Sequence, residues 1–363
     1  MGIDARLAGY APGGIAQYTL LLAEALARLG GACYTLLRAA RPREPQPPVP
    51  GARARRVWTP PHHRLEQWTL PLEVLPLGLD LLHSPDFIPL FHRRWRSVIT
   101  IHDLAFLRFP ETMTAESHRH YGQVARAVRS AERVIAVSRA TRDDLGTLLG
   151  VGGERVRVIP HGLDPRMWPR PEDEQRRART AYGLDGPYVL WVGTFEPRKN
   201  LPLLLEAFRA LRARRPALTL ALVGRRGWLD APIFALLDSP EYSRGVRVLE
   251  GVPRADLPAL YSGAALLAFP SRYEGFGLPA LEAMGCGTPV VAASVSSLPE
   301  VVGDAGLLVP PDDAEALEAA MARVLDGPAL AAALRARGLE RARGFSWERA
   351  ARATLAVYRE AMR

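Results

Sequence analysis

Short apolar segments alternate with stretches of helical periodicity along nearly the whole chain of 363 residues. This alternation is typical of strand–helix–strand units, because neighbouring parallel strands need a crossover connection between them. It predicts an α/β protein built on parallel sheets. The expected strands of the first half cover residues 32–37, 55–59, 80–84, 97–102, 133–138 and 156–160, and the expected helices cover 14–29, 116–131 and 140–149.

The pattern breaks between Asp164 and Pro187, where three prolines and a charged run at 172–179 interrupt it. We therefore expect an N-terminal domain over 1–170, a second over 171–345, and a last helix over 346–363 that packs back on the first domain. Ser346 is a suitable N-cap for that helix. In the second half, strands are expected at 188–193, 217–224, 246–250, 265–269, 288–293 and 305–309, with helices at 200–213, 313–325 and 328–342.

The net charge of +9 lies mostly in the first half of the chain. Residues 1–178 hold 25 basic and 18 acidic residues, and the remainder holds 22 and 20. The excess predicts an acidic acceptor or an anionic membrane surface as partner. The alternative is compositional, because every basic residue except Lys199 is arginine. Nucleic acid is not favoured as a partner, since no aromatic–basic pattern accompanies the arginines.

The remaining composition predicts a cytoplasmic protein. No uninterrupted run of 18 apolar residues is present, and the start, MGIDAR, lacks the basic-then-apolar pattern of a secretory signal. Cys33 and Cys286 fit no metal or redox spacing. No cluster of carboxylates at ligand spacing occurs either, so we expect no bound metal and no cofactor.

The strongest local pattern follows the expected strand 265–269. Gly275 and Gly277 bracket Phe276, and Pro279 then stands where the first turn of a helix is expected. A strand, a glycine-rich turn and a helix together expose backbone N–H groups at the carboxyl edge of a sheet, where anionic ligands bind. Glu274 and Glu282 are expected to face the same crevice.

A second strand–turn–helix pattern covers residues 193–200. Arg198 and Lys199 stand at the start of the expected helix, where two cations beside backbone N–H groups suit a diphosphate. Lys199 is the one lysine in a chain that otherwise uses arginine, which indicates that the smaller ammonium group matters. The alternative is a helix start with two solvated cations.

Two weaker patterns lie in the first half. Gly13 and Gly14 lie at the start of the expected helix 14–29, and His102 and Asp103 lie at the end of the strand expected at 97–102. Both positions are at the carboxyl edge of the expected sheet. The histidine has two interpretations, as a functional group or as a structural hydrogen-bonded one.

Six motifs in order give the chain a family resemblance. "EGFGLPALE" resembles the E-x7-E motif of the retaining glycosyltransferase family 4, and "GGIAQYT", "TIHDL", "VIPHGLD", "GTFEPRKN" and "FSWERAA" are similar to other motifs of that family. The resemblance extends from Ile3 to about Tyr358. It implies the GT-B fold, with two Rossmann-like domains facing across an interdomain cleft, the first binding the acceptor and the second the nucleotide-sugar donor.

The resemblance also implies roles for the matching residues. His102, Glu274, Arg198 and Lys199 would be catalytic. Arg198 and Lys199 would neutralise the donor diphosphate, while Glu282 would bind the ribose. The donor-binding set would comprise Gly13, Gly14, Gly193, Arg198, Lys199, Val252, Leu257, Glu274, Gly275, Phe276, Gly277, Leu278 and Glu282.

The implied reaction is metal-independent transfer of a hexose with retention, with mannose favoured because "GTFEPRKN" resembles mannosyl- and rhamnosyl-type members. GDP-mannose is the favoured donor and a UDP-sugar the alternative, and the acceptor is a glycan or a lipid-linked molecule. Retention can proceed by front-face attack, which we favour, or through a covalent intermediate on Glu274. The rival functions are a nucleotide-sugar epimerase, a phosphorylase, and a non-catalytic protein that binds nucleotide sugars or anionic lipids.

A peripheral position at the inner face of the plasma membrane is a further expectation. The proline-broken apolar stretch 68–91 and its neighbours Arg93, Arg94 and Arg96 would supply exposed aromatic and cationic groups. The alternative is that 68–91 forms a helix and a buried strand of the first sheet.

Overall fold

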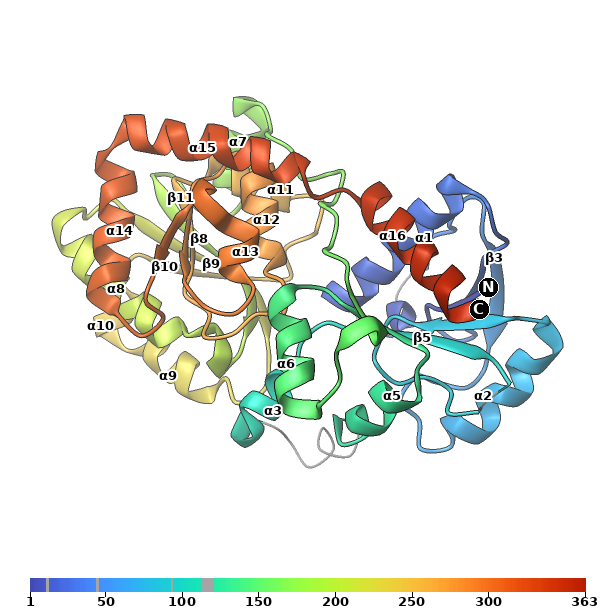
Figure 1. Cartoon of the computed structure of the whole chain (residues 1–363). Coiled ribbons are helices and arrows are strands. Elements are labelled where there is room, and N and C mark those ends of the chain that lie inside the picture. The colour runs from blue at the N-terminus through green and yellow to red at the C-terminus, as the bar shows by residue number, and fades with distance from the viewer. Residues whose placement is uncertain (11–12, 44–45, 93, 113–120) are drawn as a thin grey trace. The chain divides into compact units, whose positions relative to one another are not determined.

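The computed structural model describes residues 1–10, 13–43, 46–92, 94–112 and 121–363. They form two compact units, and each contains one parallel sheet with helices packed on it (Figure 1). The first unit comprises Met1–Gly162 and Ser346–Arg363, and the second comprises Leu163–Phe345. The prediction of two Rossmann-like α/β domains is confirmed. Of the helix expected at 116–131, residues 116–120 lie outside the described residues, and 124–130 are helical.

The first unit has a parallel sheet with the strand order β3-β2-β1-β4-β5-β6-β7. After β1 the chain moves outward through β2 and β3, then returns to the other side of β1 with β4. The strand order therefore reverses between β1 and β4, and ligands of open α/β sheets bind at such a point. The strands are β1 Gly2–Asp4, β2 Thr35–Ala39, β3 Arg53–Val57, β4 Leu81–Ser84, β5 Arg96–Ile101, β6 Arg133–Ala136 and β7 Val156–Val158.

Successive residues of these strands face opposite sides of the sheet, as strand geometry requires. One side packs on α1 (Gly14–Leu29) and α16 (Trp347–Met362), through Leu36, Leu81, Val98 and Ile135. The other side packs on α2 (Glu66–Val74) and α5 (Val124–Ser130), through Leu37, Leu82, Ile99 and Val134. The unit also contains α3 (Ala105–Arg108) and α6 (Arg139–Leu149). Both faces are covered, which explains the continuous apolar runs in the sequence.

The last helix, α16, belongs to the first unit and lies beside α1 (Figure 1). Its Tyr358 hydroxyl is 2.7 Å from His83 Nδ1, and His83 Nε2 is 2.8 Å from Thr100 Oγ1. All three side chains are buried. Burial lowers the pKa of His83 to about 3, so its ring is neutral and ties α16 to the sheet by hydrogen bonds.

The second unit has a parallel sheet with the order β10-β9-β8-β11-β12-β13. Its strand order reverses between β8 and β11, because β9 and β10 extend to one side of β8 and the later strands to the other. The strands are β8 Tyr188–Phe195, β9 Thr219–Arg226, β10 Val246–Glu250, β11 Leu266–Phe269, β12 Val290–Ala293 and β13 Leu307–Val309. The principal helices are α8 Leu201–Arg214, α9 Ala231–Asp238, α11 Leu257–Gly263, α12 Leu278–Gly285, α13 Leu298–Val302, α14 Ala314–Asp326 and α15 Pro328–Arg343.

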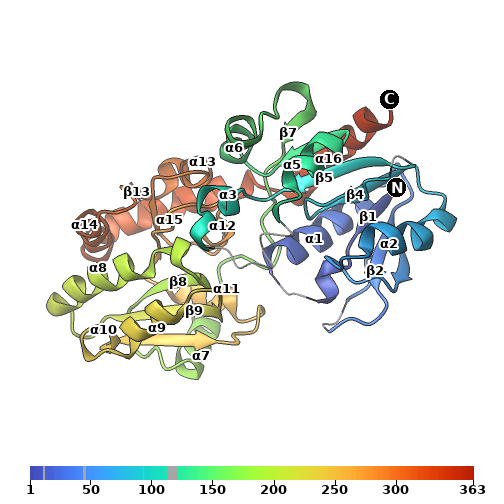
Figure 2. The same ribbon diagram turned by 90° about the horizontal axis from the view of Figure 1, so that it is seen from below.

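The predicted domain boundary at 170 and the break over 164–187 are wrong in detail. The chain passes from the first unit to the second between Gly162 and Leu163. A helix, α7 (Glu172–Ala181), occupies the charged run. Only Ala178 of α7 is buried, so the helix shows no apolar stripe in the sequence. Figure 2 shows α7 at the margin of the second unit. Acidic residues in its first turn and the 2.9 Å pair between Arg177 and Asp173 stabilise it instead. None of the described helices is both long and apolar enough to cross a membrane.

Candidate functional site

Two loops of the second unit, after β8 and after β11, meet where the strand order reverses. The first forms a short 3₁₀ turn at Pro197–Lys199 and leads into α8, and the second leads into α12. A backbone hydrogen bond of 2.9 Å from Arg272 N to Arg198 O joins them. Both strand–turn–helix patterns predicted from the sequence therefore lie at one edge of one sheet.

Lys199, Arg198 and Glu274 form an ion cluster across these two loops. The Lys199 ammonium donates to Glu274 Oε1 at 2.5 Å, and Arg198 Nη1 is 3.4 Å from the other carboxylate oxygen. Arg198 also donates to Glu196 at 2.5 Å and to the Tyr273 carbonyl at 2.7 Å. The side chains of Lys199 and Arg198 are only 10% and 15% exposed, so the alternative of two solvated cations is wrong.

The electrostatics of this cluster keep Glu274 ionised. Burial raises the pKa of a carboxyl group, but the charges of Lys199 and Arg198 outweigh it and hold the pKa of Glu274 below its usual value. The four charged groups, two cations and two carboxylates, balance one another. An arriving anion would therefore gain the two cations only by competing with Glu274 and Glu196 for them.

The glycine-rich turn before α12 has a backbone that only glycine adopts easily. Gly277 has φ +96°, and a Cβ atom there would be 2.6 Å from Cδ2 of Leu298, which is fully buried. The turn is fixed from behind by Ser297, whose hydroxyl donates to the Glu274 carbonyl at 2.8 Å. No side chain caps the start of α12 at Leu278, so the helix presents its first turn at the sheet edge.

Glu282, in the middle of α12, belongs to a second ion cluster. Arg254 donates to its Oε1 at 2.8 Å and the Tyr261 hydroxyl donates to its Oε2 at 3.1 Å. Arg254 also binds Asp164 at 3.0 Å. Burial raises the pKa of Asp164, but Arg166 and Arg254 lower it to a net value of about 2. Arg254 and Asp164 were not predicted from the sequence, although Asp164 ends the "VIPHGLD" motif and Arg254 lies between the predicted Val252 and Leu257.

The other predicted donor-binding residues of this unit lie on neighbouring elements. Gly193 is on β8, and a Cβ atom on its partner Gly224 would be 1.8 Å from the Gly193 carbonyl, so the two strands touch here through glycine. Val252 follows β10, and Leu257 begins α11 and is buried. Within the described residues, no three His, Cys, Asp or Glu side chains gather in a way that could hold a metal ion.

His102, Gly13 and Gly14 belong to the first unit. Gly13 and Gly14 are exposed at the start of α1. His102 follows β5, and its Nε2 is 2.9 Å from the Pro85 carbonyl oxygen. Since a carbonyl only accepts, Nε2 carries the proton, and burial lowers the pKa of His102 below its ordinary value. The ring is therefore neutral, with Nδ1 as its acceptor.

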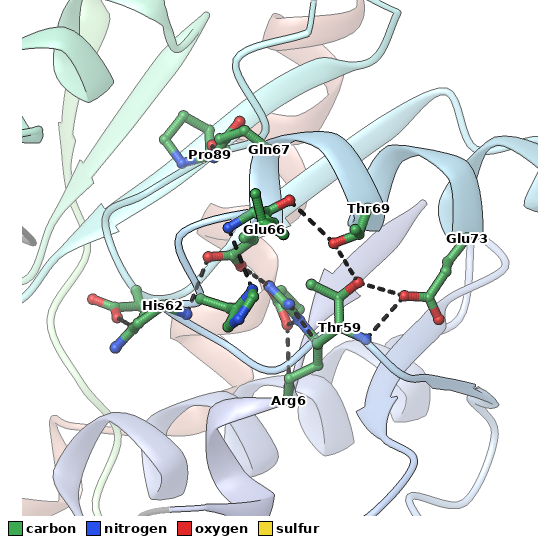
Figure 3. Close-up of polar contacts among 12 residues, drawn as sticks. Arg6, Thr59, His62, Glu66, Gln67, Thr69, Glu73 and Pro89 are labelled. Carbon is green, nitrogen blue, oxygen red and sulfur yellow. Dashed lines mark hydrogen bonds and ion pairs between the residues drawn. The ribbon is translucent and has the colours of Figure 1, made fainter.

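A polar pocket that the sequence analysis missed lies in the first unit, where the strand order reverses between β1 and β4. It encloses about 20 Å³, room for a single hydroxyl group or water molecule. Arg6 is its buried centre, and it donates to Asp4 at 2.6 Å, to the Thr59 carbonyl at 3.0 Å and to Glu66 (Figure 3). His62 and Asp86, 2.6 Å apart, also line it, together with Thr19 and Ser84.

The two units, each with charged groups at the reversal of its strand order, define a two-domain α/β protein of the GT-B class. Family models agree: glycosyl transferases group 1 matches residues 172–341, and Glycosyltransferase Family 4 matches residues 12–167. The chain belongs to glycosyltransferase family 4 and is a glycosyltransferase.

Known relatives cover most of the chain. It is 37% identical over 285 residues to O-antigen chain mannosyltransferase B of Escherichia coli. The aligned region covers 77% of this chain and 74% of that protein. It is 33% identical over 397 residues to D-inositol 3-phosphate glycosyltransferase of Kineococcus radiotolerans, with coverages of 96% and 91%. Sucrose-phosphate synthase from Thermosynechococcus elongatus has a similar structure, with a TM-score of 0.81, 27% identity and coverages of 99% and 98%.

Proposed function

We propose that this glycosyltransferase moves a hexose, with mannose favoured, from a nucleoside diphosphate sugar to a glycan or lipid-linked acceptor with retention at the anomeric carbon. The observation that carries the proposal is the buried cluster of Lys199, Arg198 and Glu274 beside the glycine-rich turn before α12. The likeness to an O-antigen chain mannosyltransferase supports the choice of mannose, and GDP-mannose is the favoured donor. A UDP-sugar is the alternative donor, and the cytoplasmic location stays a prediction.

The chemical task of the second unit is to stabilise the leaving group. As the glycosidic C1–O bond breaks, the sugar becomes oxocarbenium-like and the nucleoside diphosphate gains negative charge. Lys199 and Arg198, together with the first turn of α12, would bind that charge without a metal ion. In the unliganded arrangement the two cations bind Glu274 and Glu196, and the diphosphate would take over part of these contacts.

Glu282 and its partners would bind the nucleoside. Both carboxylate oxygens of Glu282 already accept one hydrogen bond each, from Arg254 and Tyr261, which orients them and leaves lone pairs for ribose hydroxyl groups. Val252 and Leu257 would border the base. Arg254 would act as a positioning residue for Glu282, because it joins that carboxylate to Asp164.

Glu274 bears on the choice between the two retaining mechanisms. Its carboxylate is ionised, but one oxygen binds Lys199 and the other lies near Arg198, and both cations reduce its nucleophilicity. We therefore favour front-face attack, with Glu274 contacting the transferred sugar, over a covalent intermediate. His102 would accept a hydrogen bond at Nδ1 from a hydroxyl group of the donor sugar or the acceptor.

Donor binding and product analysis test the proposal together. Thermal shifts with GDP-mannose, UDP-glucose, UDP-GlcNAc and dTDP-rhamnose would identify the base and the sugar, and we expect the largest shift with GDP-mannose. Products with and without an acceptor would separate transfer from epimerisation or phosphorolysis. If every nucleotide sugar leaves the melting temperature unchanged, the proposed donor site is wrong. Binding without turnover on any acceptor would instead favour a non-catalytic binding protein.

A further inference from the structure

Helix α2 packs on the first unit through the buried Leu70 and Val74. Polar side chains add further contacts (Figure 3). Glu66 accepts from the buried Arg6, and Thr69 Oγ1 is 2.8 Å from Thr59 Oγ1. Glu73 accepts from the backbone N–H of Thr59 at 2.9 Å. The acidic residues of α2 therefore point toward the interior of the unit.

The opposite face of α2 is apolar and exposed to solvent. Leu65, Trp68, Leu72 and Leu75 are 49%, 77%, 72% and 52% exposed. Their spacing of three and four residues puts all four on one side of α2 and of the turn that extends it, and we call them the α2 face. An ordinary surface helix has a single apolar stripe that faces the core, as Leu70 and Val74 do here, so the α2 face is a second apolar side. Figures 1 and 2 both show α2 at the margin of its unit.

Positive charge borders the α2 face. Arg64, next to Leu65, is exposed, and the edge strand β3 carries exposed arginines at 53 and 55, on the same side of the sheet as Val57. Val57 of β3 is buried in the same core cluster as Leu70 and Val74 of α2, so the strand and the helix are neighbours. The carboxylates of Glu66 and Glu73 bind Arg6 and the Thr59 backbone.

We propose that the α2 face docks on an anionic lipid surface, with Trp68 and the leucines in the interfacial region and the arginines on lipid phosphates. Tryptophan and leucine on one side of a helix, flanked by arginine, are typical of helices that lie in the plane of the interface. This surface keeps only the α2 part of the stretch 68–91 predicted from the sequence, because Phe87 and Leu90 are buried and Leu81–Ser84 form a buried strand, as the alternative had it. Of the predicted arginines, Arg93 lies outside the described residues.

The docking surface and the polar pocket of the first unit share α2. Glu66, on the inner side of the helix, lines the pocket with Arg6, His62 and Asp86. Resting on the proposed function, this arrangement would bring the hydroxyl group of a lipid-linked acceptor to the pocket while α2 lies on the membrane. Besides the pair of Arg6 and Asp4, the lining contains the carboxylates of Glu66 and Asp86. These negative charges would repel a phosphate, so the pocket suits a neutral hydroxyl group better.

Vesicle flotation tests the proposal with the full chain. Wild type should bind vesicles of phosphatidylcholine with phosphatidylglycerol, bind less as salt is raised, and not bind phosphatidylcholine alone. The double variant Trp68→Gln/Leu72→Gln should bind at least about tenfold more weakly, because it removes the apolar groups that enter the interface. Arg53→Gln/Arg55→Gln should weaken binding and flatten its salt dependence.

Trp228→Gln is the matched control, since Trp228 is another exposed tryptophan, 46% exposed, in the second unit. It should bind vesicles like wild type. All variants should keep the wild-type melting temperature, because each replaced side chain is exposed. Thermal shifts with nucleotide sugars should also be unchanged, which separates failure of docking from failure of the proposed donor site.

Three results would overturn docking. The first is no binding to anionic vesicles at low salt, and the second is equal binding by wild type and Trp68→Gln/Leu72→Gln. The third is a wild-type dimer that Trp68→Gln converts to monomer, which would show that a second copy of the chain covers the α2 face.

Discussion

The Lys199 ammonium lies 2.5 Å from the Glu274 carboxylate, although 75 residues separate the two in the chain. Their contact joins the loop after β8 to the loop after β11, at the point where the strand order of the second sheet reverses. Under the proposed function the contact would matter for catalysis, because each partner sets the state of the other: the lysine keeps Glu274 ionised, and the carboxylate holds the ammonium at the sheet edge.

Replacing Lys199 tests the role of this contact in leaving-group departure. Lys199→Ala should lower kcat at saturating donor by about 10²-fold or more, since one charge-stabilising donor is lost. Lys199→Arg should recover only part of the rate. The Lys199 side chain is only 10% exposed, and a planar guanidinium does not fit the place of a compact ammonium group in such a buried site. Steady-state kinetics measure both variants. A wild-type kcat for Lys199→Ala would show that the assignment is wrong.

Metal removal tests the charge balance of the same site. Activity should survive incubation with excess EDTA, because Arg198, Lys199 and the start of α12 supply the positive groups that the diphosphate needs. The assay compares initial rates with and without chelator after desalting. Loss of activity that Mg²⁺ or Mn²⁺ restores would contradict the prediction.

Gly277→Ala tests the turn before α12. Gly150 and Gly277 both have positive φ, +65° and +96°, but a Cβ atom meets nothing within 4 Å at Gly150. Gly150→Ala should therefore cost only the backbone strain, about 1–2 kcal/mol of unfolding free energy. Gly277→Ala should cost about 1–3 kcal/mol more, because its Cβ atom overlaps buried Leu298. Urea unfolding measures both free energies. Equal losses in the two variants would show that the turn before α12 has room for a Cβ atom at position 277.

Tyr358→Phe tests how α16 is held. Removing the hydroxyl leaves buried His83 Nδ1 without its partner, which should reduce the unfolding free energy by about 1–3 kcal/mol. Tyr242→Phe is the control, because Tyr242 is a partly exposed tyrosine of the second unit. Urea midpoints of the two variants give the comparison. No difference between them would mean that the His83–Tyr358 contact contributes nothing net to stability.

The pH dependence of stability follows from the buried histidines. His83 has a folded pKa of about 3 against an ordinary value of 6.5, so the unfolded chain binds its proton first as the pH falls. The stabilisation is present above about pH 6.5 and is lost progressively as the pH falls toward 3. His62 acts in the opposite direction. Burial lowers its pKa, but the hydrogen bond and charge of Asp86 raise it above the ordinary value.

Urea unfolding at several pH values measures this balance, and NMR titration of the imidazoles assigns it. Stability should fall between pH 7 and pH 4, while the His83 resonances show no titration. A His83 ring that titrates near pH 6.5 in the folded protein would contradict the prediction.

Most strands could be predicted from the sequence because they are buried on both faces and therefore read as continuous apolar runs, as at Tyr188–Phe195. Local patterns also placed Lys199, Glu274 and Glu282 in two strand–turn–helix segments. The partners of these residues could not be predicted in the same way. Arg254 reaches Asp164 across 90 residues and Glu282 across 28, and only the fold brings the three together.

Helices α7 and α2 show the other reason why sequence patterns fail. In α7 stability comes from charges, with a single buried residue, so no periodic apolar signal exists. In α2 apolar residues lie on both sides of the helix: Leu70 and Val74 are buried, and the α2 face is exposed. A rule that assigns apolar residues to the interior would place Trp68 inside with Leu70 and Val74, but its side chain is 77% exposed.

The return of α16 to the first unit has a consequence for synthesis on the ribosome. The second unit is one continuous segment, Leu163–Phe345, and can fold as soon as it emerges. The first unit cannot complete its fold at that stage, because α16, which covers α1 and binds His83, is translated after the whole of the second unit. During elongation the apolar side of α1 stays uncovered, and the nascent chain needs protection there until residues 346–363 leave the exit tunnel.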